Sequence, residues 1–192
     1  MPPARWCLLE LASLALFASA ARAQPAVQSI VSAVPGSPAI TSSISVAVSA
    51  GAVQSLGNVT DNVVNNFPTP VTIMLTWELH PSTAHVRVIG YFANPALAMA
   101  SGPVGIPSSW IKGRVLTADV TGAPTTFTPF TQNAIGGVGS AGGSLSLMTQ
   151  LILGHSRTGS QTIDLELQLD LVGRVLTPGN YSGTLNIRAV TQ

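Results

Sequence analysis

Residues 161–171 read QTIDLELQLDL and residues 181–192 read YSGTLNIRAVTQ, and these two stretches decide the fold class. In both, apolar and polar residues alternate at every second position, which is typical of a strand with one buried and one solvated face. The predicted buried faces carry Ile163, Leu165, Leu167, Leu169 and Leu171 in the first stretch, and Tyr181, Leu185, Ile187 and Ala189 in the second. The turn signal Pro178-Gly179-Asn180 separates them.

The same alternation recurs through the rest of the chain. It predicts strands at 39–50, 59–64, 110–120 and 145–153, a hairpin at 70–92 and a proline-bearing edge segment at 124–129. Residues 136–144, GGVGSAGGS, are predicted to be the most flexible segment. About eight or nine strands with frequent turn signals and no helix predict an all-β, immunoglobulin-like β-sandwich.

The N-terminus has the pattern of a cleavable signal peptide. Arg5 precedes an apolar run, and Ala21-Arg22-Ala23 is a cleavage signature. We therefore expect residues 1–23 to be the leader, 24–38 a flexible arm with proline stops, and 39–192 a single domain. The apolar run is shorter than the roughly 18 residues that span a bilayer, so no stable membrane span is expected.

The composition excludes some classes of function. Only 8% of the 192 residues are charged, and 46% are hydrophobic. Without residues 1–23 the basic and acidic residues balance, so the chain lacks the clustered positive charge that nucleic-acid binding needs. The single cysteine, Cys7, falls in the predicted leader, which leaves no disulfide and no thiol nucleophile for the domain.

Three residue clusters could carry chemistry, and each has a simpler explanation. Residues 154–159, GHSRTG, resemble part of a nucleophile elbow, but a strand follows instead of a helix. His80 and His85 flank a turn near Glu78, without a third or fourth metal ligand. The carboxylates of the 161–171 strand share one face, as solvated side chains do. We predict no catalytic, cofactor-binding or metal-binding residues, and hence no enzyme.

The segment 176–187, LTPGNYSGTLNI, resembles the closing strand of secreted bacterial β-sandwich subunits. These are the spore coat protein U-like domains and, more distantly, the chaperone–usher pilins, which commonly end in a Pro-Gly-x-Tyr-x-Gly-x-Leu pattern. Gly179 stands at the fourteenth position from the end, where pilins carry a glycine. Thr191 stands where pilins usually have an aromatic residue, and the disulfide of many such subunits is absent.

The resemblance implies an incomplete sandwich that a strand from a neighbour completes, a form of β-augmentation. The implied closing-strand residues are Gly179, Tyr181, Gly183, Leu185 and Ile187. The candidate donor strand carries Ile40, Ile44, Val46 and Val48, with residues 24–38 leading into it. The alternative is that residues 39–50 are an ordinary first strand of their own sheet.

The expected function is a non-enzymatic, secreted structural or adhesive subunit of a bacterial surface or pilus-like assembly. Its expected partners are other copies or related subunits, and the resemblance adds a periplasmic chaperone. The expected location is the periplasm, the cell surface or the medium. The alternative is a monomeric, secreted carbohydrate- or peptide-binding module that uses exposed aromatic residues such as Trp110 or Tyr91.

Overall fold

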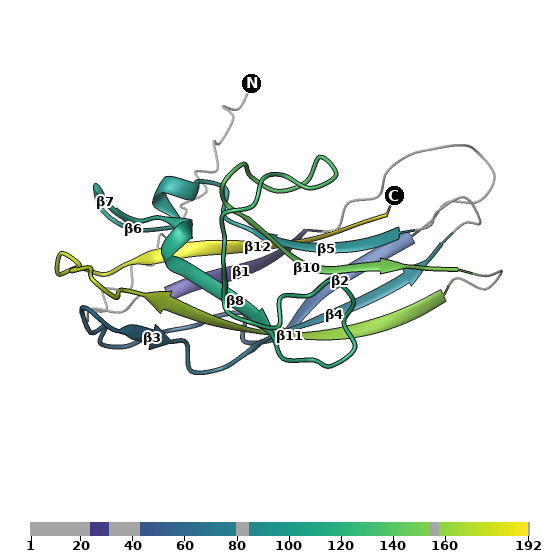
Figure 1. The fold of residues 1–192 in the computed structure, drawn as a ribbon, viewed down its shortest axis with the longest axis horizontal. Coiled ribbons are helices and arrows are strands. Elements are labelled where there is room, and N and C mark those ends of the chain that lie inside the picture. The colour runs from purple at the N-terminus through teal and green to yellow at the C-terminus, as the bar shows by residue number, and fades with distance from the viewer. Residues whose placement is uncertain (1–23, 31–42, 80–84, 154–157, 192) are drawn as a thin grey trace, which may run out of the picture.

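A computed structural model describes residues 24–30, 43–79, 85–153 and 158–191. These residues form twelve β-strands and two single-turn 3-10 helices, arranged as two layers of sheet (Figure 1). The predicted all-β sandwich is therefore confirmed. The expected leader at 1–23 lies outside the described residues. Within them, no helix has the length and apolar character to cross a membrane.

The first sheet is built around the last strand of the chain. Its order is β10 (Ser144–Leu151), β5 (His85–Tyr91), β12 (Ser182–Thr191), β6 (Met99–Ser101) and β7 (Val104–Ile106). β5 and β6 follow one another along one edge of β12, and β1 (Gln24–Ile30) pairs with the other edge. The short helices η1 (Pro95–Leu97) and η2 (Ser108–Trp110) flank β6 and β7 in the sequence.

The second sheet is built around the strand predicted at 161–171, which begins earlier, as β11 (Thr158–Asp170). Its order is β2 (Ser43–Ala50), β4 (Val71–Glu78), β11, β8 (Ile111–Val115) and β9 (Thr128–Pro129). The short strand β3 (Val64–Asn66) also pairs with β11. β9 lies at the sheet edge within the predicted edge segment 124–129, and β3 begins where the strand predicted at 59–64 ends. The three-residue strands β6 and β7 were not predicted, because they are too short for an alternating pattern to show.

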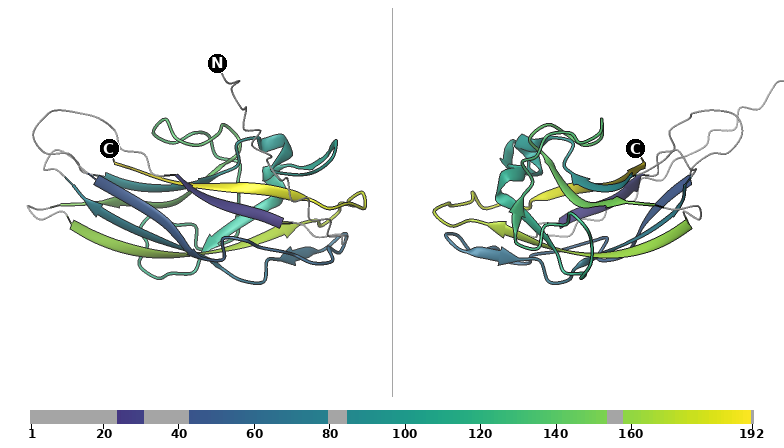
Figure 2. Two further views of the ribbon diagram at one scale, coloured as in Figure 1. Left: turned by 180° about the vertical axis from the view of Figure 1, so that it is seen from behind. Right: turned by 45° about the vertical axis from the view of Figure 1, so that its right-hand side comes forward.

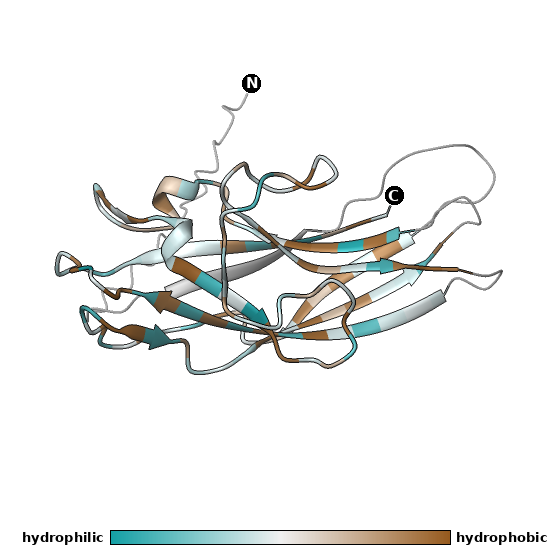
Figure 3. Cartoon of the chain, viewed as in Figure 1, coloured by the Kyte–Doolittle hydropathy of each residue, from teal (hydrophilic) through white to brown (hydrophobic). Residues whose placement is uncertain are grey.

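The core lies between the two sheets. Leu165, Leu169 and Leu171 are completely buried, and so are Leu185 and Ile187 of β12. Bands of hydrophobic and hydrophilic residues alternate along the strands (Figure 3). The two stretches that carry the alternating pattern therefore supply the facing halves of one core.

The predicted hairpin at residues 70–92 is wrong. β4 lies in the second sheet between β2 and β11, whereas β5 lies in the first sheet between β10 and β12. β11 and β12 likewise follow each other in the sequence and lie in opposite sheets. Alternation shows which face of a strand is buried. It does not show whether two consecutive strands pair within one sheet or pack against each other from opposite sheets, because the pattern is the same in both cases.

Loops cover part of the first sheet. The outer edge of β10 is hydrogen-bonded to them: the amide of Thr149 donates to the carbonyl of Thr121, and that of Ser146 to Oε1 of Gln132. The backbones of Ser144 and Gln132 also exchange two hydrogen bonds. In the glycine-rich segment 136–144, Val138 is buried against Ile89 and Val190 on the outer face of this sheet. Sheet edges that remain open invite pairing with other chains, so this coverage limits association along β10.

Candidate functional site

The edge of β12 that pairs with β1 is the candidate site. β1 runs parallel to β12, in register from Gln24 opposite Ser182 to Ile30 opposite Arg188. All the other strand pairs of the described residues are antiparallel. Figure 2 shows β1 beside β12 at the margin of the first sheet, where it passes close to β2 of the second.

β1 is a strand where the sequence predicted a flexible arm at 24–38. The apolar residues of this segment have a spacing closer to that of a helix than of a strand, and prolines follow them, so the pattern gave no strand signal. The remainder of the predicted arm, 31–38, lies outside the described residues. β1 fills the margin of the sandwich between β12 and β2, and the chain supplies this strand from its N-terminal side.

The predicted closing-strand residues gather at the start of β12. Tyr181, Leu185 and Ile187 are buried in the core. A Cβ atom at Gly183 would lie 2.0 Å from the carbonyl oxygen of Ala98, and one at Gly179 would lie 2.6 Å from Oγ of Ser101. Two glycines of the Pro-Gly-x-Tyr-x-Gly-x-Leu pattern thus stand where other parts of the chain approach the backbone closely.

Tyr181 closes the corner between β11 and β12. Its hydroxyl donates a 2.8 Å hydrogen bond to the carbonyl of Thr177, four residues upstream. This is the geometry of a tyrosine corner, which recurs at the same kind of turn in immunoglobulin-like sandwiches. Burial raises the pKa of the phenol, so the hydroxyl stays protonated and remains a donor.

The predicted donor residues lie in β2, within the chain's own second sheet. Ile44 and Val46 are buried, and their cross-strand partners on β4 are Trp77 and Leu75. Val48 packs against the same core, and Ile40 lies outside the described residues. In this structure the segment holds the place that the alternative interpretation gives it, an internal strand. Replacing Ile44 or Val46 with aspartate would therefore damage the core directly.

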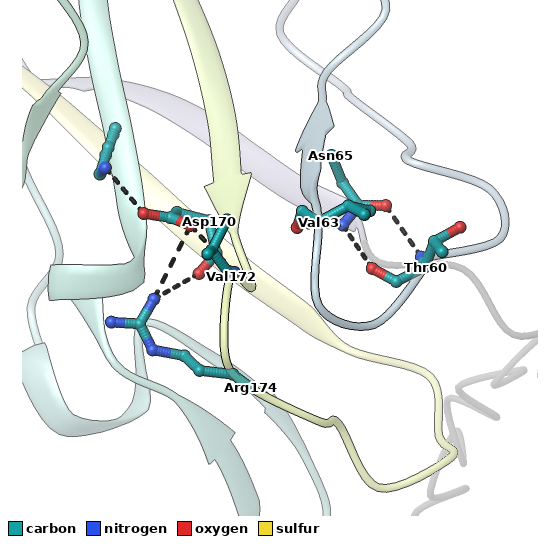
Figure 4. Close-up of polar contacts among 7 residues, drawn as sticks. Thr60, Val63, Asn65, Asp170, Val172 and Arg174 are labelled. Carbon is teal, nitrogen blue, oxygen red and sulfur yellow. Dashed lines mark hydrogen bonds and ion pairs between the residues drawn. The ribbon is translucent and has the colours of Figure 1, made fainter.

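A polar cluster holds the loop after β11. The carboxylate of Asp170 lies 2.7 Å from Nζ of Lys112 and accepts a 3.1 Å hydrogen bond from the amide of Val172 (Figure 4). Arg174 donates to the carbonyl of Asp170 at 2.7 Å, and its guanidinium lies 4.8 Å from the ring centroid of Trp110. The hydrogen bond from Lys112, followed by that from Val172, lowers the pKa of the Asp170 carboxyl.

The loop between β2 and β3 is tied to this segment. The side chain of Asn65 accepts from the amide of Thr60 and donates to its carbonyl, both at 2.9 Å (Figure 4). The amide of Asn62 donates to the carbonyl of Arg174 at 3.0 Å, and the amide of Leu176 donates to Oδ1 of Asp61 at 2.9 Å. These bonds join two loops that are more than a hundred residues apart in sequence.

A pocket of about 310 Å³ lies between these two loops. Its described lining comes from residues 57–61 on one side and residues 176–181 on the other, with Tyr181 among the latter. None of the sequence predictions included this pocket. Gly57-Asn58 is a turn signal and Asn58-Val59-Thr60 matches the N-glycosylation pattern, but neither indicates a pocket. Only the folded chain brings Asn58 and Asp61 to the closing-strand turn.

Among the described residues, the others that could carry chemistry or binding do not assemble into a site. His80 and residues 154–157 lie outside the described residues. Within the described ranges, no group of three or more His, Cys, Asp or Glu side chains could hold a metal ion. Trp110 and Tyr91 are partly buried, and Arg174 covers one face of Trp110, so neither ring is a fully exposed platform for a ligand.

Comparison with known proteins adds no family to this description. No protein-family model matches the chain, and no curated protein is significantly similar to it.

Proposed function

We propose that the protein is a non-enzymatic, secreted subunit that joins copies of itself or related subunits into a structural or adhesive surface assembly by β-strand complementation. The observation that carries the proposal is the parallel pairing of β1 with β12 at the margin of the sandwich. At this margin β1, from the N-terminal side of the domain, occupies the place of an edge strand. A neighbouring molecule could supply the same segment.

In this proposal β1, rather than residues 39–50, is the strand that is exchanged. β1 and β2 are each hydrogen-bonded to a single strand, β12 and β4 respectively. Exchange of β2 would also remove the two buried side chains that it contributes to the core, Ile44 and Val46. Parallel pairing is somewhat less stable per residue than antiparallel pairing. A strand from another copy that runs antiparallel to β12 would form the more stable ladder, and this difference offsets part of the free energy cost of association.

The same edge would accept other extended segments, because main-chain hydrogen bonds do not depend on side-chain identity. Related subunits and a periplasmic chaperone are partners of this kind, and they follow from the resemblance of residues 176–187. The near absence of charge supports close association, since low net charge lowers the electrostatic barrier between copies. The periplasm, the cell surface or the medium is the setting that the predicted leader implies.

The test removes the main-chain donors of β1. In a parallel ladder, alternate residues bond to the neighbouring strand, so the double substitution Val27→Pro and Gln28→Pro removes one donor whichever residues face β12. The matched control, Val27→Ala with Gln28→Ala, keeps both amides. We expect light scattering to show polymers for the control and a monomer for the proline variant.

A synthetic peptide of residues 24–30, QPAVQSI, distinguishes loss of pairing from failure to fold. The proposal expects this peptide, added in excess, to bind the proline variant and to raise its melting temperature. If the wild-type protein stays monomeric over the whole concentration range, strand exchange between copies is excluded.

A further inference from the structure

The pocket between residues 57–61 and 176–181 lies outside the β1–β12 pairing and suggests a second role. The register of β1 begins opposite Ser182, and the pocket lining ends at Tyr181. Its volume of about 310 Å³ is at the lower end of the range for small-molecule pockets, about 300 to 1,000 Å³. A pocket of this size suits a single ring rather than an extended chain.

The walls of the pocket are held before any ligand arrives. The hydrogen bond from Leu176 to Asp61 joins the two sides, and the bond from Asn62 to the Arg174 carbonyl joins them again nearby. Tyr181 is anchored through its hydroxyl to the carbonyl of Thr177. A pocket with pre-organised walls binds a small ligand without the entropy loss of ordering two loops.

The lining combines an apolar surface with a few polar groups. Val59 and Leu176 are half-buried and pack against the core, and the buried ring of Tyr181 lies beneath them as the floor of the pocket. Asp61 uses Oδ1 for the Leu176 amide, and no donor among the described residues reaches its Oδ2. The amide of Asn58 is exposed and likewise makes no hydrogen bond within the described part of the chain.

This combination selects a chemical class. A sugar ring presents aliphatic C–H groups on one face and hydroxyl groups around its rim, so it can use the apolar and the polar lining together. Hydroxyl groups can donate to the free carboxylate oxygen of Asp61, and both donate to and accept from the amide of Asn58. No described lining residue is basic, so the negative charge of Asp61 would repel an anionic ligand.

We propose that this pocket binds one neutral hexopyranose ring, with Asn58 and Asp61 holding its hydroxyl groups and Leu176, supported by the buried Tyr181, packing against its C–H face. The proposal goes beyond strand complementation and does not depend on it. In a surface assembly, such a site would give each subunit a weak affinity for a glycan, and the many copies along the assembly would raise the avidity.

The test titrates the full-length, ¹⁵N-labelled protein with glucose, galactose, mannose and N-acetylglucosamine, and follows amide chemical shifts. We expect at least one of these sugars to give saturable shifts confined to residues 57–61 and 176–181. Asn58→Ala should weaken that binding by about tenfold, as the loss of a ligand hydrogen bond does. Asn133→Ala, an exposed asparagine of another loop, is the matched control and should bind like the wild type.

Asp61→Asn is a second variant, because its side-chain oxygen can still accept from the Leu176 amide while the charge is lost. This variant distinguishes loss of a ligand contact from disruption of the loop. Weaker sugar binding with an unchanged melting temperature supports the proposal. The proposal is overturned if none of the four sugars shifts these amides, if Asn58→Ala binds as tightly as the wild type, or if glucuronate binds more tightly than the neutral sugars. Polymerisation of the variants, measured alongside, reports on strand exchange independently.

Discussion

Replacing Gly183 with alanine tests whether the start of β12 is as closely packed as the structure requires. The new Cβ atom would lie 2.0 Å from the carbonyl oxygen of Ala98 and 2.9 Å from Cγ of Met99. An ordinary contact begins near 3.4 Å, so the carbonyl would have to retreat by about 1.4 Å. The nearest atom belongs to the backbone and cannot rotate away as a flexible side chain can.

We therefore expect a cost at the upper end of that for overpacking, about 3 kcal/mol. For a domain of this size that corresponds to a fall in melting temperature of about 6 to 12 °C. Urea unfolding followed by tryptophan fluorescence measures the free energy, and calorimetry measures the melting temperature. Ser182→Ala, a change at the exposed neighbouring position, should stay close to the wild type. A Gly183→Ala protein within about 0.5 kcal/mol of the wild type would refute the close approach of Ala98.

Three further substitutions test the core, the corner and the polar cluster. Leu165→Ala in the centre of β11 should lower the free energy of unfolding by about 3 kcal/mol, because a completely buried side chain leaves a cavity; denaturant titration measures this. Tyr181→Phe should cost about 1 kcal/mol in the same assay through loss of the bond to the Thr177 carbonyl, and a neutral result would show that water replaces it. The lowered pKa of Asp170 means that its ionised form stabilises the fold above the pKa of an unfolded aspartate, about 3.9, and that this stability is lost as the pH falls below that value. Asp170→Asn should therefore cost about 1 kcal/mol at pH 7 through loss of the Lys112 ion pair, and its stability should fall less steeply than that of the wild type below pH 4.

The fold class could be predicted because alternation is a local property. Ile163, Leu165 and Leu169 show at once which face of their strand is buried, and the structure buries all three. The pairing of strands could not be predicted in the same way. The short turn signal between β4 and β5 suggested a hairpin, but the two strands lie in opposite sheets.

The candidate site was only partly accessible from the sequence. The pattern from Pro178 to Leu185 drew attention to the turn that precedes β12, and the structure places a tyrosine corner and a pocket there. The strand that lies along β12 was missed, since residues 24–30 lack the alternation that marks the other strands. Asn58 and Asp61 were missed because their meaning depends on a loop more than a hundred residues away.

The sequence by itself determined that this chain forms sheets with one apolar face each, because apolar residues recur at every second position within each strand. The tertiary structure decided which strands share a sheet, which segment pairs with the last strand, and which loops meet to form a pocket. Those choices depend on how the whole set of apolar faces can be buried at once. No single stretch of sequence contains that information. The alternation in β12, for example, would be the same with or without the parallel strand β1 at its edge.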